Sequence, residues 1–393
     1  MFQYSLPRRY AMKSPDLSVR AFFHYKYSLS SWRMTEDRAQ HQFPDHAIDK
    51  NKETIVKRIL AIIIIIIASA FAAIPAFAQK QFKVTERVRL GGEGGWDYLT
   101  YDQDGQRLFI TRGSHVMVID TKTLKVAGDI PDLSGIHGVA LAPESNRGFV
   151  SNGGDNTVTI FDLKTLKKIG SVNVGERPDA ILYEPFSKRV FTFNARSQDS
   201  TVIDAASGKV VGTVPLGGKP EFPASDGKGK LYVNIEDKSQ IAEIDVTKLS
   251  VLNTWSVAPC QEPSALAFDV KNHRLFAGCG NKMMVVVNSD SGKVVTTVPI
   301  GEGVDAGRFN PNTQQVFMSC GEGVLTVIHE DSPDKYTVQQ NLTTVRGART
   351  MALDRENNVA YLVTAQREDK PVAAGQRPTM VPGSFELIVV KAE

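Results

Sequence analysis

Ionisable side chains recur about every 42 residues through most of the chain, most of them in loops rich in glycine. These side chains are Asp97, His137, Asp179, Glu221, Glu262, Asp305 and Arg349. Several carboxylates gathered at one place would suit a hard cation such as Ca²⁺, or a cationic or polyhydroxylated ligand. Singly, each would pair with a neighbouring basic group or cap a backbone amide. The case for a site therefore depends on whether the fold brings these residues together.

The sequence contains none of the motifs that mark common catalytic or cofactor sites. The chain has no GxSxG nucleophile motif, no HExxH zinc motif and no CxxCH haem-attachment motif. Its glycine-rich segments follow the repeat and never lead into a helical pattern, which excludes a phosphate-binding loop. His137 is the histidine of most interest, because it alone falls in one of these loops.

The elements that would position these side chains are short strands, seen most clearly between Gly175 and Gly217. Alternating apolar residues rich in Val, Ile, Phe and Thr predict four strands. The predicted strands are Ala180–Tyr183, Arg189–Phe193, Ser200–Asp204 and Lys209–Pro215. The last two are joined by Asp204-Ala-Ala-Ser-Gly208, in which Asp starts a turn and Gly permits positive φ.

This unit recurs with a constant phase. Its third strand ends at Asp120, Asp162, Asp204, Asp245, Asn288 and His329, at intervals of 42, 42, 41, 43 and 41 residues. Its second strand carries an aromatic residue in all seven units: Phe109, Phe149, Phe191, Tyr232, Phe276, Phe317 and Tyr361. The period predicts an all-β, seven-bladed β-propeller with four-stranded antiparallel blades. A β-sandwich is the alternative, but both markers keep their phase throughout.

The two ends of the repeat region predict how the ring closes. Gln81–Leu90 resembles an outer fourth strand, whereas Ser384–Val390 resembles a third strand with no fourth after it. Pairing these two segments would let the N-terminal strand complete the last blade. Such pairing hides a sheet edge that would otherwise be exposed.

A propeller would bring the ionisable residues together. The first strand of each blade lines the axis, so the loops before these strands surround one mouth of the channel. A long join in the seventh unit, Gln366–Gly383, belongs to the same face and contains three prolines. We expect it to act as a lid with Arg367, Lys370 or Arg377 facing the acidic residues; a solvated excursion is the alternative.

Composition and charge limit the partners. Residues 1–78 hold 11 of the 46 Lys and Arg and 6 of the 43 Asp and Glu, which leaves 35 against 37 in the ring. A near-neutral ring argues against nucleic acid as the partner. The partner that we expect at the channel face is therefore a small ligand, a cell-envelope component or a protein.

An export signal precedes the repeats. Residues 57–78 combine a Lys57-Arg58 start, the apolar run Ile62–Ile67 and an Ala76-Phe77-Ala78 cleavage site. We expect cleavage rather than a stable membrane span, and a periplasmic or secreted propeller over residues 79–393. Residues 1–56 precede the signal, so we expect a non-native extension from a start assigned too early, or a disordered segment.

Three cysteines remain in the exported part. Cys260 precedes the first strand of the fifth unit and Cys279 ends its second, so a Cys260–Cys279 disulfide suits a hairpin. Cys279–Cys320, between adjacent blades, competes with it.

The segments Phe149–Gly175 (FVSNGGDNTVTIFDLKTLKKIGSVNVG) and Leu231–Val257 resemble repeats of the YVTN β-propeller family, the YncE-like proteins. The resemblance covers roughly Gln81–Val390 and implies a periplasmic propeller, with no catalytic residues to transfer. It favours a binding scaffold that uses its channel face. Related rings suggest two alternatives: a lactonase-like hydrolase with a channel metal, using Asp97, Asp179, Glu221, Glu262 and Asp305, and a redox or cofactor-binding propeller.

Overall fold

The computed structural model describes residues 54–55, 57–59, 80–368 and 379–393. The chain divides into residues 1–77 and residues 78–393, and the account below concerns the second unit. No helix among the described residues is long and apolar enough to cross a membrane.

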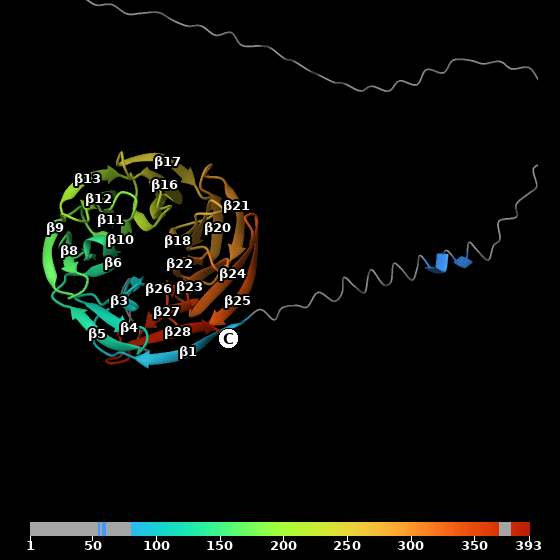
Figure 1. The fold of residues 1–393 in the computed structure, drawn as a ribbon, viewed down its shortest axis with the longest axis horizontal. Helices are drawn as coiled ribbons and strands as arrows, with labels where there is room; N and C mark the ends of the chain where they lie inside the picture. The colour runs from blue at the N-terminus through green and yellow to red at the C-terminus, as the bar shows by residue number, and fades with distance from the viewer. Residues whose placement is uncertain (1–53, 56, 60–79, 369–378) are drawn as a thin grey trace, which may run out of the picture. The chain divides into compact units, whose positions relative to one another are not determined.

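Seven four-stranded antiparallel sheets stand in a ring (Figure 1). Blade 1 has β2 (Leu99–Asp102), β3 (Arg107–Thr111), β4 (Val116–Asp120) and β5 (Lys125–Ile130). Blade 2 has β6 (Ile136–Ala142), η1 (Pro143–Ser145), β7 (Arg147–Asn152), β8 (Thr157–Asp162) and β9 (Lys168–Asn173). Blade 3 has β10 (Pro178–Glu184), β11 (Arg189–Asn194), β12 (Asp199–Asp204) and β13 (Val210–Pro215). Blade 4 has β14 (Pro220–Ser225), β15 (Lys230–Ile235), η2 (Glu236–Lys238), β16 (Gln240–Asp245) and β17 (Ser250–Ser256).

The remaining blades keep the same order. Blade 5 has β18 (Pro263–Asp269), β19 (Arg274–Cys279), β20 (Met283–Asn288) and β21 (Val294–Pro299). Blade 6 has β22 (Val304–Asn310), β23 (Gln315–Cys320), β24 (Val324–Ser332) and β25 (Lys335–Thr343). Blade 7 has β26 (Met351–Asp354), β27 (Val359–Thr364), β28 (Glu386–Ala392) and, from the other end of the chain, β1 (Phe82–Arg89). The predicted fold class and the closure by the N-terminal strand are thus confirmed.

Local sequence explains the hairpins between third and fourth strands. The Asp120 carboxylate accepts hydrogen bonds from the backbone N–H groups of Lys122 and Thr123, at 3.0 and 2.8 Å. Leu124 then takes a left-handed conformation with φ 56° and closes the turn. Blade 6 departs from this pattern, because β24 continues past His329 to Ser332. The prediction that the third strand ends at His329 is therefore wrong.

The core lies between neighbouring blades. All seven second-strand aromatics are buried, with exposed fractions of 0 to 4%. Tyr361, for example, stacks on Tyr101 of blade 1 with ring centroids 5.7 Å apart. Because each blade buries its apolar faces on its neighbours, the innermost strands and the loops before them occupy fixed positions around the axis (Figure 1).

Candidate functional site at the channel mouth

The loops that lead into the innermost strands surround a cavity of about 670 Å³. Six of the predicted site residues line it: Asp97, His137, Asp179, Glu221, Asp305 and Arg349. They come from six of the seven blades, and Asp97 and Arg349 each lie two residues before the first strand of their blade. Residues that lie some forty positions apart in sequence therefore share one cavity.

His137 and two carboxylates form the tightest cluster in this cavity. The Nδ1 atom of His137, in β6, lies 2.7 Å from Oδ2 of Asp97 and 3.8 Å from Oδ1 of Asp179. One ligand atom from each of the three residues lies within 4.8 Å of the others. Burial lowers the pKa of His137, but the two carboxylates outweigh burial and raise the pKa above its ordinary value. Three potential metal ligands thus converge from blades 1, 2 and 3.

Two ion pairs complete the ionisable wall. The Nε atom of Arg349 contacts Asp305, and its Nη2 atom lies 3.5 Å from Oδ1 of Asp97. Opposite, the Nζ atom of Lys219 lies 2.8 Å from Oε1 of Glu221. Burial raises the pKa of Asp305 to about 6. Burial and then the charge of Asp179 raise the pKa of Glu221 to about 8, although its ion pair with Lys219 favours the charged carboxylate.

An aromatic floor closes the cavity. Tyr98 lines it, is only 5% exposed, and meets Phe222 edge-to-face with centroids 5.1 Å apart. Burial raises the pKa of Tyr98 well above its ordinary value, and the surrounding acids raise it further. The tyrosine therefore stays protonated and offers a hydroxyl at the floor.

Polar side chains of neighbouring strands hold the site residues by their backbone carbonyls. Thr111 donates to the carbonyl of His137 at 3.0 Å, and Thr350 donates to that of Asp97 at 2.9 Å. Ser151 does the same for Asp179. The sequence analysis did not identify these hydrogen bonds between hydroxyl groups and the backbone carbonyls of the site residues. Its signal is a hydroxyl two residues after the second-strand aromatic, as in Phe109–Thr111 and Phe149–Ser151.

Arg112 is a second positioning residue that the sequence analysis missed. Its side chain is fully buried and donates to the carbonyls of Gly91, Glu93, Gly94 and Gly95 at 2.8–3.3 Å. Its guanidinium also lies 3.5 Å from the centre of the Phe385 ring. Arg112 therefore fixes the glycine-rich segment that leads directly to Asp97.

Two predicted site residues do not join the cluster. Glu262 is exposed, and its carboxylate lies toward Gly280 in the β19–β20 turn of its own blade. Its φ of 49° places it in a tight turn ahead of β18. Its predicted place in the channel wall is therefore wrong. Arg377 and Lys370 lie outside the described residues.

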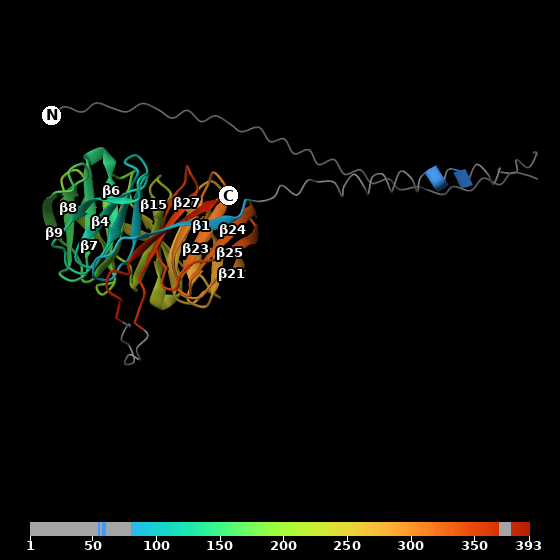
Figure 2. The same cartoon turned by 90° about the horizontal axis from the view of Figure 1, so that it is seen from below.

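The stems of the predicted lid are described. Arg367 pairs with Met380 in an antiparallel bridge, and the Arg367 guanidinium lies 5.5 Å from the centre of the Trp96 ring. A cavity of about 470 Å³ lies beside the stems and shares Trp96 and Arg349 with the channel mouth. Figure 2 shows both stems leaving the ring on the same side.

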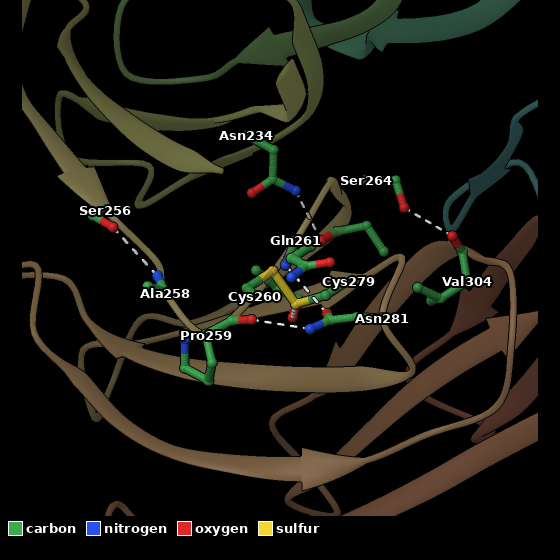
Figure 3. Close-up of a disulfide and its surroundings, with 12 residues drawn as sticks. Asn234, Ser256, Ala258, Pro259, Cys260, Gln261, Ser264, Cys279, Asn281 and Val304 are labelled. Carbon is green, nitrogen blue, oxygen red and sulfur yellow. Dashed lines mark hydrogen bonds between the residues drawn. A yellow bond between two sulfur atoms is a disulfide. The ribbon is translucent and has the colours of Figure 1, made fainter. Parts of the chain in front are cut away.

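A disulfide joins Cys260 to Cys279, with Cα atoms 5.4 Å apart (Figure 3). The competing Cys279–Cys320 pairing is therefore wrong in this structure. Cys320 is a buried free thiol, and burial raises its pKa to about 12. The side chain of Asn281 donates to the carbonyl of Pro259 at 2.9 Å and braces the same corner of blade 5.

The architecture defines the class of protein as a seven-bladed β-propeller, and comparison with solved structures agrees. The chain is similar to hydrazine synthase of Kuenenia stuttgartiensis, with a TM-score of 0.59 and 17% identity over 68% of this chain and 92% of that one. It is also similar to a chain of a mitotic checkpoint complex, with a TM-score of 0.65 and 13% identity over 81% and 94% of the two chains. At these identities the likeness concerns the fold alone.

No family model matches the chain, and no curated protein matches it. The resemblance to the YVTN repeat thus depends on the motifs themselves.

Proposed function

We propose that the protein is an exported YVTN-type β-propeller that binds a small polar ligand at its channel mouth, with a divalent cation held by Asp97, His137 and Asp179. The observation that carries the proposal is the convergence of these three side chains from separate blades. Their side chains are each 19 to 26% exposed, so an ion would remain accessible to a ligand in the cavity.

The donor atoms favour a particular class of ion. Ca²⁺ prefers oxygen ligands throughout, whereas an imidazole with two carboxylates suits Zn²⁺ or another first-row divalent ion. The acids alone suggested Ca²⁺, but the imidazole of His137 makes Zn²⁺ or another first-row divalent ion the better match for this site. The opposed pairs Asp305–Arg349 and Glu221–Lys219 would complement a ligand with several hydroxyl or mixed polar groups.

The disulfide in blade 5 supports export, because disulfides persist in oxidising compartments. The signal over residues 57–78 lies largely outside the described residues, so export remains part of the proposal. So does the YVTN assignment.

Metal titration tests the proposal. The purified ring, stripped with a chelator, is titrated with Zn²⁺, Mn²⁺ and Ca²⁺ by calorimetry. We expect one Zn²⁺ or Mn²⁺ per chain, with affinity reduced at least about tenfold in His137→Gln and Asp97→Asn. His329→Gln is the matched control, since His329 also contacts an aspartate, Asp331 at 2.8 Å, but away from the axis. Absence of binding by the native chain, or unchanged binding by His137→Gln, would refute the cation site.

A metal-dependent hydrolase is the second candidate. It is favoured by Glu221, whose raised pKa would let it exchange a proton close to neutral pH in the same cavity as the cation cluster. Zinc-loaded protein would be assayed with a set of small lactones. Turnover that is lost in both His137→Gln and Glu221→Gln would favour the hydrolase, whereas metal binding without turnover would favour the binding protein.

A further inference from the structure

The opposite mouth of the axial channel holds a separate cavity of about 590 Å³. The C-terminal halves of all seven innermost strands line it, so it is the far end of the same axis. Tyr98 and Phe222, in edge-to-face contact, separate it from the acidic mouth. We call it the far cavity.

Two arginines give the far cavity its charge. Arg308, in β22, places its guanidinium carbon 4.6 Å from the centre of the Phe222 ring. Arg355 follows β26, and its backbone carbonyl accepts hydrogen bonds from Asn310 and Asn312, both at 3.1 Å. Both arginines line the cavity, and the loop that carries Arg355 is anchored to blade 6.

Neither guanidinium has a counter-ion within the described part of the chain. Arg308 donates one hydrogen bond there, to the carbonyl of Gly307 at 2.7 Å, and neither arginine forms an ion pair. Burial and then the nearby charge of Arg355 lower the pKa of Arg308 to about 10, and burial also lowers the pKa of Arg355. Two neighbouring cations without counter-ions, of which Arg308 is half-buried and Arg355 exposed, would gain from an anion between them.

The remaining charges around the cavity do not cancel the arginines. Asp102 is bound by Arg107 at 2.7 Å, which leaves Asp104 as the acid on the rim without an ion pair among the described residues. An adjoining cavity of about 550 Å³ shares Arg355 and adds Lys228, Lys271, His273 and Asp269. The linings of these two cavities together hold more basic than acidic side chains, whereas the opposite mouth sets four carboxylates beside Arg177, Lys219 and Arg349.

The walls beside the arginines are apolar and include Leu141, Leu182, Phe222 and Phe268. We propose that the far cavity binds a small organic carboxylate with an apolar body, its carboxylate between Arg308 and Arg355 and its body against Phe222 and Leu182. Guanidinium forks match carboxylate oxygens, and the apolar walls would reward burial of a ring or short chain.

Binding of three probes tests the proposal by calorimetry in EDTA, so that any cation at the other mouth is removed. Benzoate has both features, benzyl alcohol lacks the charge, and inorganic phosphate lacks the apolar body. We expect saturable binding of benzoate, with affinity at least about tenfold greater than that of either other probe. Equal binding of benzyl alcohol would refute the role of the arginines, and equal binding of phosphate would refute that of the walls.

Variants locate the site. Arg355→Gln, on an exposed loop, should fold normally and weaken benzoate binding at least about tenfold; Arg308→Gln should do the same, with folding checked by thermal denaturation. Asp104→Asn should strengthen binding, because it removes the acid on the rim. Arg196→Gln, on an exposed hairpin outside the far cavity, is the matched control. Native affinity in Arg355→Gln, or no benzoate binding by the native chain, would overturn the proposal.

Discussion

The ring of His137 is held between two neighbours. Its Nδ1 atom meets Asp97 at 2.7 Å, and its Nε2 atom lies against Gly153, where an added Cβ would be 2.8 Å away. Glycine at position 153 therefore leaves space for the imidazole in the orientation that faces the two carboxylates. The contact joins the tip of one hairpin of blade 2 to the start of its innermost strand.

Replacing this glycine tests whether the orientation matters. In Gly153→Ala, the new Cβ would lie 2.8 Å from Nε2 and 3.2 Å from the carbonyl of Pro178, so the ring must move. We expect the affinity for Zn²⁺ to fall about tenfold, as for changes that misorient a metal ligand. Gly170→Ala is the matched control, because nothing lies within 4 Å of its added Cβ. Calorimetry on both variants makes the comparison, and equal affinities would count against a positioned imidazole.

A second prediction for a single residue concerns Arg112. Arg112→Met keeps an apolar body against Phe385 but leaves four backbone carbonyls without their donor. We expect unfolding in urea to show a loss on the order of 3 kcal/mol and the cation affinity to fall, because the loop before Asp97 loses its anchor. Arg196→Met, on an exposed hairpin, should change neither quantity. Native stability in Arg112→Met would show that water satisfies the carbonyls.

The sequence predicted the site residues that occupy equivalent positions in successive repeats. It missed the residues that have no equivalent in the other repeats. Asp97, Asp179 and Asp305 occupy equivalent places, so phase alone located them. Arg112 could not be found in this way, because an arginine after a strand usually points to solvent. Glu262 was misplaced because it stands before Pro263 as Arg177 stands before Pro178, so Ser264 holds the place equivalent to Asp179.

Pairs of blades are also joined by carboxyl groups. Asp269 ends β18 and Glu330 lies in β24, and each has a buried carboxyl oxygen with no other partner among the described residues. Tyr336 donates to the other oxygen of Glu330 at 3.1 Å. Burial and then the charge of Asp269 raise the pKa of Glu330 to about 7, so below that pH Glu330 holds a proton that lies between it and Asp269.

This pair predicts a pH dependence of stability. Between the unfolded pKa of about 4.5 and the folded pKa of about 7, only the folded chain holds the shared proton. The free energy of unfolding should therefore fall as pH rises through this range, by on the order of 2 kcal/mol. Glu330→Gln donates a hydrogen bond without needing a proton, so its stability should fall less between pH 5 and pH 8 in urea titrations.

Exposed Glu302→Gln serves as the control for that comparison and should follow the native chain. An identical fall in Glu330→Gln and the native chain would show that the pair does not link pH to blade packing.

Sequence could not have indicated this contact, because Asp269 and Glu330 belong to different blades and to non-equivalent strands. The strands themselves were predictable, since alternation and turn residues act locally. Two exceptions are β24, which continues past His329 to Ser332, and β28, which begins at Glu386 rather than Ser384 because the Ser384 hydroxyl bonds back to the carbonyl of Val381.

At the scale of the whole molecule, the ring depends on a contact between its two ends. β1 pairs with β28 along the last blade, and Phe82 near its start packs edge-to-face on Phe317 of blade 6 at 5.3 Å. Gln340 of β25 bonds both the N–H and the carbonyl of Phe82, at 2.8 and 2.9 Å. The N-terminal strand therefore joins blades 6 and 7 as well as completing one sheet. The sequence predicted that β1 pairs with β28. It could not predict the hydrogen bonds of Gln340 to Phe82, because they form only where the ring brings β25 of blade 6 beside β1.

Phe82→Ala tests how far closure governs the ring. Phe82 is 1% exposed, so the truncation removes a buried ring and leaves a cavity between two blades, at a cost of about 3–5 kcal/mol. Because β1 covers the edge of β28, the loss should appear first as faster hydrogen exchange in β1 and β28 than in blades 2 to 4. Val126→Ala, on the exposed outer strand of blade 1, should leave both stability and exchange unchanged. If Phe82→Ala loses stability evenly around the ring, with no local opening in blade 7, closure would be a property of all seven interfaces together, and the N-terminal strand would hold no special place among them.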